Sequence, residues 1–173
     1  YFGIKNILIL KGGLKNWKKS GGETTAKKTI ISKGNFVSKT EKKDLVVNLE
    51  EMISISKNNS KVILDARSYK RFIGDAKEPR PGLQSGHIPN SKSLPSSELL
   101  TNDGFLKSIE ELDKFFSKND IDTSEDIIAT CGSGVSACVI SVALYCLGKE
   151  NIPIYDGSWT EWATSGQEIQ TGN

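Results

Sequence analysis

The spacing of apolar positions changes once along residues 126–147. Residues 127–129 form an apolar run of strand length. From residue 135 onward, apolar positions recur every three or four residues, as on one face of a helix. The positions that follow this spacing are Val135, Cys138, Val139, Val142, Ala143, Cys146 and Leu147. The pattern predicts a strand, a short loop and a helix, with Cys138 and Cys146 on the buried face of that helix.

Similar segments alternate along the chain from Leu45 onward. We expect helices near residues 49–55, 69–72, 109–116, 135–147 and 159–164. We expect strands near residues 62–64, 93–94, 127–129 and 152–155. This alternation predicts an α/β fold with a parallel sheet flanked by helices. Because ligands bind at the carboxyl ends of such strands, Asp65, Cys131 and Asp156 should gather at one edge of the sheet.

Residues 2–23 resemble residues 147–168 at a constant offset of 145, without a gap. Identical pairs are Gly3/Gly148, Asn6/Asn151, Ile7/Ile152, Ile9/Ile154, Gly12/Gly157, Trp17/Trp162, Ser20/Ser165, Gly21/Gly166 and Glu23/Glu168. A repeated supersecondary unit explains this similarity. Each copy is expected to contain a buried strand, a glycine turn and a short helix with a tryptophan. The first copy therefore predicts a strand at 6–10 and a helix at 14–19.

Charge is distributed unevenly between the two parts of the chain. Residues 1–44 contain 11 lysines against Glu23, Glu41 and Asp44, a net charge of +8 that leaves −6 for the remainder. This stretch has no arginine and its lysines are scattered, which favours a solvated linker over a nucleic-acid-binding arm. The opposite charges of the two parts could help them dock. No apolar run approaches the ~18 residues of a membrane span, so we expect no membrane partner.

The loop between the strand and the helix carries the most specific chemistry. Cys131 follows the strand, and Gly132 and Gly134 permit a tight turn. Backbone N–H groups at the start of a helix carry partial positive charge, which favours a thiolate. The same groups would hold a second anionic sulfur on that cysteine. The three cysteines have no Cys-x-x-Cys spacing, so we expect neither a zinc site nor a disulfide framework. We also expect no cofactor.

The sequence of this loop resembles the active-site loop of the rhodanese superfamily. Residues 131–137 read Cys-Gly-Ser-Gly-Val-Ser-Ala, similar to the Cys-Gly-Ser/Thr-Gly-Val-Thr/Ser-Ala loop of 3-mercaptopyruvate sulfurtransferases. Thiosulfate-using members usually have a basic pair after the cysteine, where this chain has the neutral Gly132 and Ser133. The resemblance therefore favours a monoanionic keto acid as donor. Phosphatases of this fold place an arginine where this chain has Ala137, which argues against phosphate transfer.

A second block resembles the family's signature upstream of the catalytic loop. It runs through Asp65-Ala66-Arg67, Arg71-Phe72-Ile73-Gly74, Glu78-Pro79-Arg80 and Gly86-His87-Ile88-Pro89. The resemblance implies a rhodanese-like three-layer fold. It also implies that Arg71 and Arg80 bind the carboxylate and keto oxygen of the donor, for which guanidinium groups are suited. Asp65 and Arg67 are expected to fix the end of their strand rather than to touch substrate.

His87 is the single histidine of the chain, which raises the hypothesis of a Cys–His dyad. We favour the alternative that backbone dipoles alone stabilise the thiolate. In the family this histidine ties down a loop. The resemblance gives Ser133 a different role, in a hydroxyl–histidine–aspartate arrangement whose other two members come from a preceding domain.

The resemblance implies a sulfurtransferase that carries sulfur from 3-mercaptopyruvate to a thiol acceptor, such as thioredoxin or a small dithiol, and releases pyruvate. Cys131 would carry the persulfide, with Ser133 as the second catalytic residue. The residues expected to bind substrate are Arg71, Arg80, Gly132, Gly134, Val135 and Ser136. A thiosulfate:cyanide sulfurtransferase is the alternative enzyme. The cysteine content suits a reducing compartment, either the cytoplasm or the mitochondrial matrix.

The internal repeat and the resemblance together predict the domain organisation. Sulfurtransferases of this type have two rhodanese domains in tandem, the first of them inactive. Residues 1–20 are expected to be the C-terminal remnant of a first domain, residues 21–44 a linker and residues 45–173 the catalytic domain. If the active site lies between two domains, such a chain could also be a rhodanese module without turnover.

Overall fold

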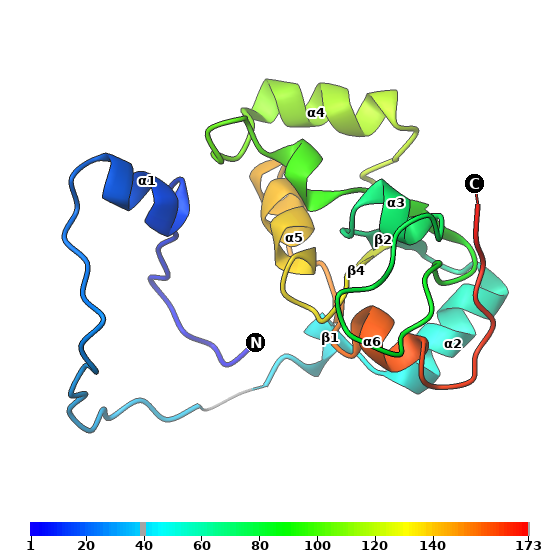
Figure 1. Cartoon of the computed structure of the whole chain (residues 1–173), viewed down its shortest axis with the longest axis horizontal. Helices are drawn as coiled ribbons and strands as arrows, with labels where there is room; N and C mark the ends of the chain where they lie inside the picture. Colours follow the sequence, from blue (N-terminus) through cyan, green and yellow to red (C-terminus); the bar gives the residue numbers. More distant parts are fainter. Residues whose placement is uncertain (39–40, 173) are drawn as a thin grey trace.

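A five-stranded parallel sheet forms the centre of the computed structural model, which describes residues 1–38 and 41–172 (Figure 1). The strand order within the described residues is β1-β5-β4-β2-β3, and each pair is parallel. The strands are β1 (Val46–Val47), β2 (Val62–Asp65), β3 (Ser91–Ser93), β4 (Ile127–Thr130) and β5 (Ile154–Tyr155). The α/β fold and the parallel sheet are therefore confirmed.

Helices cover both faces of the sheet. The helices of the described residues are α1 (Gly13–Lys19), α2 (Leu49–Asn58), α3 (Tyr69–Phe72), α4 (Ile109–Lys118), α5 (Ala137–Cys146) and α6 (Ser158–Trp162), with 3-10 helices at Lys43–Leu45 and Ser96–Leu99. Of these, α1 has no buried residue and covers neither face. Helices α4 and α5 contribute to one buried cluster, and α2 and α6 contribute to the other. No helix in the described part of the chain is both long and apolar enough to cross a membrane.

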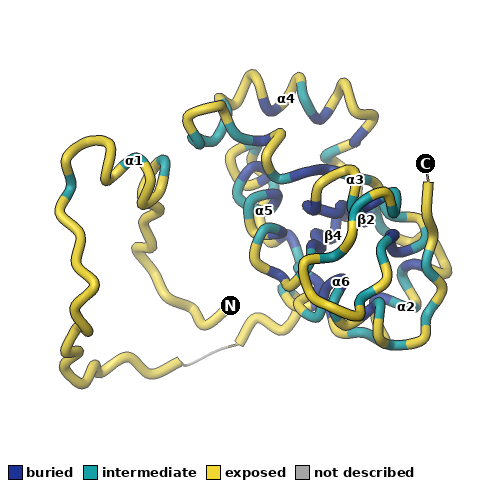
Figure 2. The backbone as a smooth tube through the Cα atoms, viewed as in Figure 1, coloured by how far each residue is buried: buried dark blue, intermediate teal, exposed yellow. Residues whose placement is uncertain are grey.

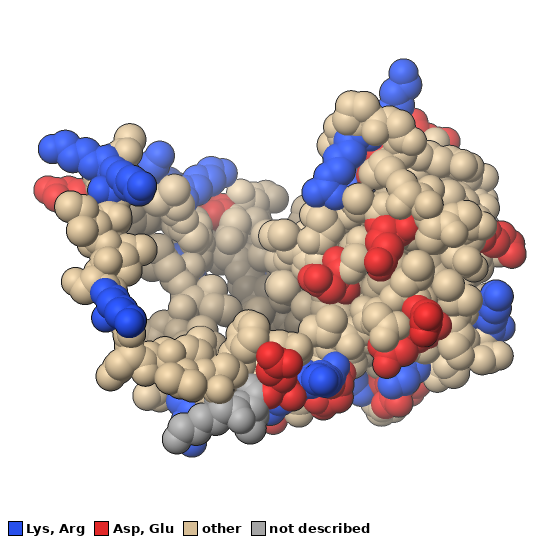
Figure 3. Space-filling view, turned by 90° about the horizontal axis from the view of Figure 1, so that it is seen from below, with Lys and Arg blue, Asp and Glu red and all other residues tan. Residues whose placement is uncertain are grey.

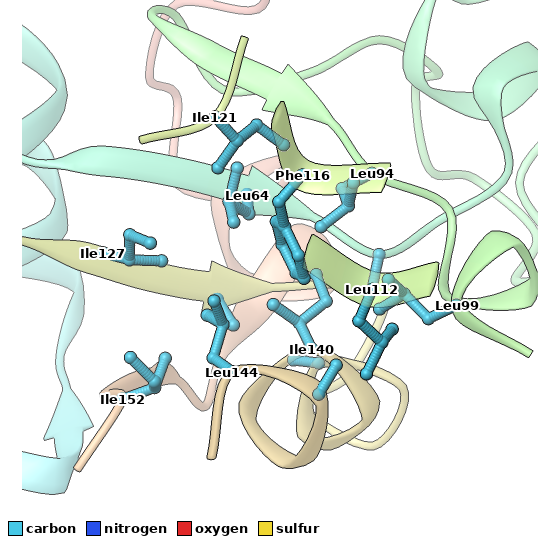
Figure 4. Close-up of a cluster of buried hydrophobic side chains, with 14 of the residues drawn as sticks. Leu64, Leu94, Leu99, Leu112, Phe116, Ile121, Ile127, Ile140, Leu144 and Ile152 are labelled. Atoms are coloured by element: carbon cyan, nitrogen blue, oxygen red, sulfur yellow. The ribbon is translucent and has the colours of Figure 1, made fainter. Parts of the chain in front are cut away.

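Alternation along the central strands divides the core between these two clusters. Leu64 and Ala129 face the cluster under α4 and α5, while Ile63 and Ile128 face the cluster under α2 and α6. Figure 4 shows the first cluster, and Figure 2 shows the buried strands enclosed by more exposed helices. Because both faces are covered, β4 is buried at every position. A rigid central strand thus leads directly into the cysteine loop.

The buried face of α5 differs from the one predicted by apolar spacing. The helix begins at Ala137, so Val135 belongs to the loop and is 76% exposed. Cys138 and Cys146 are exposed, and the prediction that they lie in the core was wrong. The buried positions are Ala137, Ile140, Ala143 and Leu144. This helix is apolar around most of its circumference, so periodicity alone could not identify the face that packs on the sheet.

Residues 6–10 form no strand, contrary to prediction, whereas the helix predicted at 14–19 is present as α1. A β-strand requires a hydrogen-bonded neighbour, and none of the strand pairings among the described residues involves residues 6–10. Ile7, Leu8 and Ile9 are exposed. The described part of residues 21–42 contains no helix or strand and is almost entirely exposed.

The N-terminal segment shares some local features with its sequence counterpart, although Gly12 has a φ of 77° where Gly157 has one of −59°. The indole N–H of Trp17 donates to the carbonyl of Glu23 at 2.9 Å, and that of Trp162 donates to the carbonyl of Glu168 at the same distance. Asn6 has a φ of 60° and Asn151 one of 58°. The two copies differ in burial, since Trp17 is 44% exposed and Trp162 is 2% exposed.

Few described contacts join the N-terminal segment to the sheet domain. The amide of Asn16 donates to the carbonyl of Asp103 at 2.7 Å, and Lys19 forms an exposed ion pair with the Asp103 carboxylate. Lys11 lies over the ring of Phe105. Figure 3 shows mostly basic side chains over the N-terminal segment and a mixture of acidic and basic ones over the sheet domain.

Candidate active site

Cys131 lies at the bottom of a pocket beyond the carboxyl end of β4. The pocket has a volume of about 330 Å³. Its lining residues are Arg71, Glu78, Pro79, Arg80, Leu83, Cys131, Gly132, Ser133, Val135, Ser136 and Thr160. Of the residues that the sequence nominated, the pocket therefore brings together all except Gly134. A Cβ on Gly134 would lie 3.1 Å from Oδ1 of Asp156, which places this glycine behind the loop.

The sulfur of Cys131 receives hydrogen bonds from its own loop and from the first residue of α5. Burial by itself raises the pKa of the thiol. Hydrogen bonds from the Ser136 hydroxyl and from the backbone N–H groups of Ser133, Ala137 and Ser136 outweigh this effect, so the pKa of Cys131 lies below its ordinary value. The loop therefore favours a thiolate that faces the pocket.

Helix α6 supports the same loop from behind. The backbone N–H of Trp159 donates to the carbonyl of Cys131 at 2.9 Å, and that of Thr160 donates to the carbonyl of Gly132 at 3.1 Å. Two carbonyls of the loop are therefore turned toward α6. The N–H groups that stabilise the sulfur remain available on the pocket side.

Ser158 at the start of α6 anchors two further N–H groups of the loop. Its hydroxyl accepts from the N–H of Gly134 at 2.9 Å and from that of Cys131 at 3.3 Å, and it donates to the carbonyl of Tyr155 at 2.8 Å. The residue is fully buried and has a φ of 51°, which a non-glycine residue adopts at a cost. Ser158 thus fixes the conformation of the loop without lining the pocket.

The two arginines of the pocket have different environments. Nε and Nη2 of Arg71 donate to the two carboxylate oxygens of Glu78 at 3.0 and 2.5 Å. Glu78 also accepts from Nη1 of Arg67 at 3.0 Å. The side chains of Arg67 and Glu78 are almost completely buried, whereas that of Arg71 is 23% exposed. Glu78 therefore compensates much of the charge of Arg71 and fixes its guanidinium beside the cysteine loop.

Arg67 has the structural role expected from the sequence. Its guanidinium donates to Asp65 through Nε and Nη2 and to the carbonyl of Gly86 at 2.7 Å. It also lies 4.2 Å from the ring centroid of Trp159. These contacts join the end of β2 to the loop before β3 and to α6.

Arg80 is exposed at the edge of the pocket, and its Nη1 donates to the hydroxyl of Thr160. The same hydroxyl donates to the carbonyl of Gly132 at 2.6 Å. Arg80 is therefore connected to the cysteine loop through one side chain of α6. Unlike Glu78, this acceptor is neutral, so the charge of Arg80 is not compensated by it.

His87 is buried in a structural position. Its Nδ1 lies 2.9 Å from the carbonyl oxygen of Phe72, and its ring stacks on the Phe72 ring at a centroid distance of 3.9 Å. The backbone N–H and carbonyl of His87 both form hydrogen bonds with the backbone of Gln170. His87 does not line the pocket of Cys131, which agrees with the rejection of a Cys–His dyad.

A second thiol on α5 is less suited to ionisation. Partial burial and the negative charge of a Cys131 thiolate raise the pKa of Cys138. Its Sγ lies 3.5 Å from the carbonyl oxygen of Gly134, a separation that permits a weak S–H donor contact. Within residues 1–38 and 41–172, no group of three or more His, Cys, Asp or Glu side chains is arranged to hold a metal ion.

Sequence reasoning missed the supporting roles of Glu78, Ser158 and Thr160. Glu78 stood inside the Glu-Pro-Arg motif, and an acidic residue between two arginines could have suggested a shared ion pair. Ser158 and Thr160 follow a predicted strand end, but a hydroxyl in a turn has no sequence pattern that identifies its partners. Their partners lie more than twenty residues away in the chain.

Comparisons with known proteins agree with this fold. Residues 48–165 match the family described as the rhodanese-like domain. A mitochondrial thiosulfate/3-mercaptopyruvate sulfurtransferase of Arabidopsis thaliana is 38% identical, over 94% of this chain and 48% of the relative. A thiosulfate sulfurtransferase of Gallus gallus is 39% identical, over 93% of this chain and 55% of the relative.

A solved structure extends the likeness to three dimensions. The crystal structure of the Tum1 protein from Saccharomyces cerevisiae superposes with a TM-score of 0.80 at 29% identity, covering 92% of this chain and 59% of that protein. The chain spans about half the length of the curated relatives it matches. The family match covers the sheet domain that surrounds Cys131, apart from β1 and the residues after 165. The chain therefore belongs to the rhodanese-like domain family.

Proposed function

We propose that this protein is a sulfurtransferase that carries sulfur on Cys131 as a persulfide. The observation that carries this proposal is the sulfur of Cys131 itself, which faces a pocket with two arginines while donors from its own loop lower its pKa. A thiolate in such a site is a nucleophile, and the same donors would stabilise a terminal persulfide sulfur. The names of the relatives support transfer of sulfur as the reaction class.

In the first half-reaction, the Cys131 thiolate attacks the sulfur of 3-mercaptopyruvate. An S–S bond forms, the C–S bond of the donor breaks, and its electron pair leaves with the carbon as pyruvate enolate. The thiol proton of the donor stays on the outer sulfur, and the enolate takes a proton from solvent to become pyruvate. Arg71 and Arg80 hold the carboxylate and keto oxygen, which orients the donor sulfur toward Cys131.

In the second half-reaction, the thiolate of an acceptor attacks the outer sulfur. The new S–S bond forms on the acceptor, and Cys131 leaves as a thiolate, which regenerates the enzyme. Thioredoxin or a small dithiol has the required chemistry. Ser133 is exposed at the mouth of the pocket, where its hydroxyl can contact donor or acceptor. Gly132, Val135 and Ser136 form the remaining wall of the loop.

The charges of the pocket favour a monoanionic donor. Its described lining contains two guanidinium groups, Arg71 and Arg80, and one carboxylate, Glu78. The net positive charge of one matches the carboxylate of 3-mercaptopyruvate better than the two charges of thiosulfate. Positions 132 and 133 add no cation. Thiosulfate remains the second candidate donor, because relatives of similar identity are named for it.

We further propose that residues 1–20 are the C-terminal unit of another rhodanese-like domain, followed by a linker over residues 21–44. The repeated sequence and the matching Trp17 and Trp162 hydrogen bonds support this assignment. The cysteines of the described chain are free thiols, which suits the cytoplasm or the mitochondrial matrix.

Steady-state kinetics with both donors test the proposed function. We expect kcat/KM for 3-mercaptopyruvate, measured as pyruvate release with a dithiol acceptor, to exceed kcat/KM for thiosulfate, measured as sulfite release with the same acceptor, by about tenfold or more. Cys131→Ser should abolish release, and the matched Cys138→Ser should leave it unchanged. Release that survives in Cys131→Ser would refute the mechanism. A preference for thiosulfate would refute the donor assignment alone.

A further inference from the structure

The connection between Arg80 and the cysteine loop passes through one hydroxyl. We propose that Thr160 is a positioning residue, which holds the guanidinium of Arg80 so that it meets the carboxylate of the donor. This inference rests on the proposed function for the identity of the donor. The placement of the Arg80 guanidinium can be tested without it. Thr160 itself contacts Arg80 and the loop, and its action on the donor passes through Arg80.

The hydrogen bonds of Thr160 determine which way its hydroxyl points. Its one proton is given to the carbonyl of Gly132 at 2.6 Å, so its oxygen lone pairs remain as acceptors. Nη1 of Arg80 donates to this oxygen. The backbone N–H of Thr160 donates to the same Gly132 carbonyl at 3.1 Å, which fixes the residue against the loop. The acceptor offered to Arg80 is thus fixed relative to Cys131.

The neutrality of this acceptor matters as much as its position. Arg71 is held by a carboxylate, and its charge is largely compensated by Glu78. Arg80 is exposed and held by a hydroxyl, so its full charge remains available to an anion in the pocket. A free arginine loses rotamer entropy when it is ordered. Ordering Arg80 before the donor arrives removes part of that cost from binding.

Pyruvate protection of Cys131 against alkylation tests this role without turnover. Pyruvate is a monoanionic keto acid without a transferable sulfur, and iodoacetamide is a neutral reagent. In the full chain carrying Cys138→Ser, we expect Thr160→Val to raise the pyruvate concentration for half-protection by about five- to tenfold. Thr160→Ser keeps the hydroxyl and should restore protection. Thr164→Val, just beyond the end of α6, is the matched control and should have no effect, because the Thr164 hydroxyl donates to the carbonyls of Thr160 and Glu161 rather than to the cysteine loop.

A double-mutant comparison establishes whether Thr160 acts through Arg80. In an Arg80→Ala background, Thr160→Val should weaken protection no further. The pH midpoint of alkylation should also stay unchanged in Thr160→Val, because the donors to the sulfur come from Ser133, Ser136 and Ala137. An equal loss of protection with and without Arg80, or a shifted pH midpoint, would overturn the proposal and indicate a general role in loop structure.

The outcomes separate this proposal from the proposed function. If mercaptopyruvate loads sulfur onto Cys131 but pyruvate protects Cys131 equally well in Thr160→Val and in the unaltered chain, the positioning role is wrong and the function stands. If no sulfur is loaded but protection depends on Thr160 through Arg80, the positioning role stands and the function is wrong. Absence of pyruvate protection in the unaltered chain would contradict the placement of Arg80 as a binding cation.

Discussion

At the scale of single residues, opposing effects act on the sulfur of Cys131. Burial disfavours the thiolate, and donors from Ser133, Ser136 and Ala137 favour it more strongly. Burial and the nearby Cys131 charge act together to raise the pKa of Cys138. Cys131 should therefore react faster than Cys138, although Cys138 is the more exposed residue.

The pH dependence of alkylation should report this difference. In Cys138→Ser, the rate at Cys131 should rise with pH as the thiolate forms, with a midpoint below the ~8.5 of an ordinary thiol. Ser136→Ala removes a donor to the thiolate, so its midpoint should shift upward, whereas Ser117→Ala on the remote α4 should not shift it. Mass spectrometry of iodoacetamide-treated protein measures each rate. A midpoint unaffected by Ser136→Ala would contradict the account of the thiolate.

The sequence revealed the residues of the site that carry a recognisable pattern. Cys131 could be nominated from its strand–loop–helix setting, and Arg71 and Arg80 from the resemblance to the rhodanese family. The structure places all three around one pocket. Ser158 and Thr160 could not be identified in this way. Their roles depend on hydrogen bonds to a loop that only the folded sheet brings next to α6.

At the scale of elements, the cysteine loop is held between β4 and α6. Two backbone N–H groups of α6 donate to loop carbonyls, and the hydroxyl of Ser158 accepts from two N–H groups of the loop. Gly134 packs against Asp156 just after β5, where a Cβ would lie 3.1 and 3.2 Å from two oxygens of Asp156, closer than an ordinary contact. The shape of the loop therefore depends on the strand and helix that follow it, as well as on its own sequence.

Alanine substitutions at two glycines with similar backbone angles distinguish the effect of backbone strain from the effect of contact with neighbouring atoms. Gly134 has a φ of 77° and Gly148 one of 86°, but only at Gly134 would a Cβ meet neighbouring atoms. Alanine at either position should lower the free energy of unfolding by about 1–2 kcal/mol through strain. Only Gly134→Ala should also slow sulfur loading of Cys131, by about tenfold or more. Urea unfolding and loading rates measure the two effects, and equal loading rates would show that the Asp156 contact is unimportant.

Element types could be predicted better than their packing. The helix at 69–72 and the strands around 62–64 and 127–129 were identified from spacing and are present. The strand at 6–10 was wrong because its apolar sequence lacks a neighbouring strand here. β1 was missed because its two residues, Val46 and Val47, are too few to show alternation.

At the scale of the whole molecule, one sequence unit occurs in two environments. In the second copy, Trp162 packs into the cluster beneath α2 and α6, whereas in the first copy Trp17 is largely exposed. Both make the same indole hydrogen bond to a carbonyl six residues later. The indole hydrogen bond is therefore shared by the two copies, while the strand and the burial that stabilises the fold belong to the second.

Paired alanine substitutions should measure this difference in burial. Trp162→Ala should lower the free energy of unfolding by about 3–5 kcal/mol because it leaves a cavity in the core. Trp17→Ala should lower it by less than about 1 kcal/mol. Urea titrations of the full chain provide the comparison. Similar losses at both positions would mean that the N-terminal segment is part of the cooperative core.

Intact-mass spectrometry after mixing the full chain with 3-mercaptopyruvate tests the central claim most directly. The account predicts the gain of one sulfur atom, mapped by peptide analysis to Cys131 and absent from Cys131→Ser. Subsequent addition of a dithiol should remove that sulfur. A chain that gains no sulfur, or that carries it on Cys138 or Cys146, would contradict the assignment of Cys131 as the sulfur carrier.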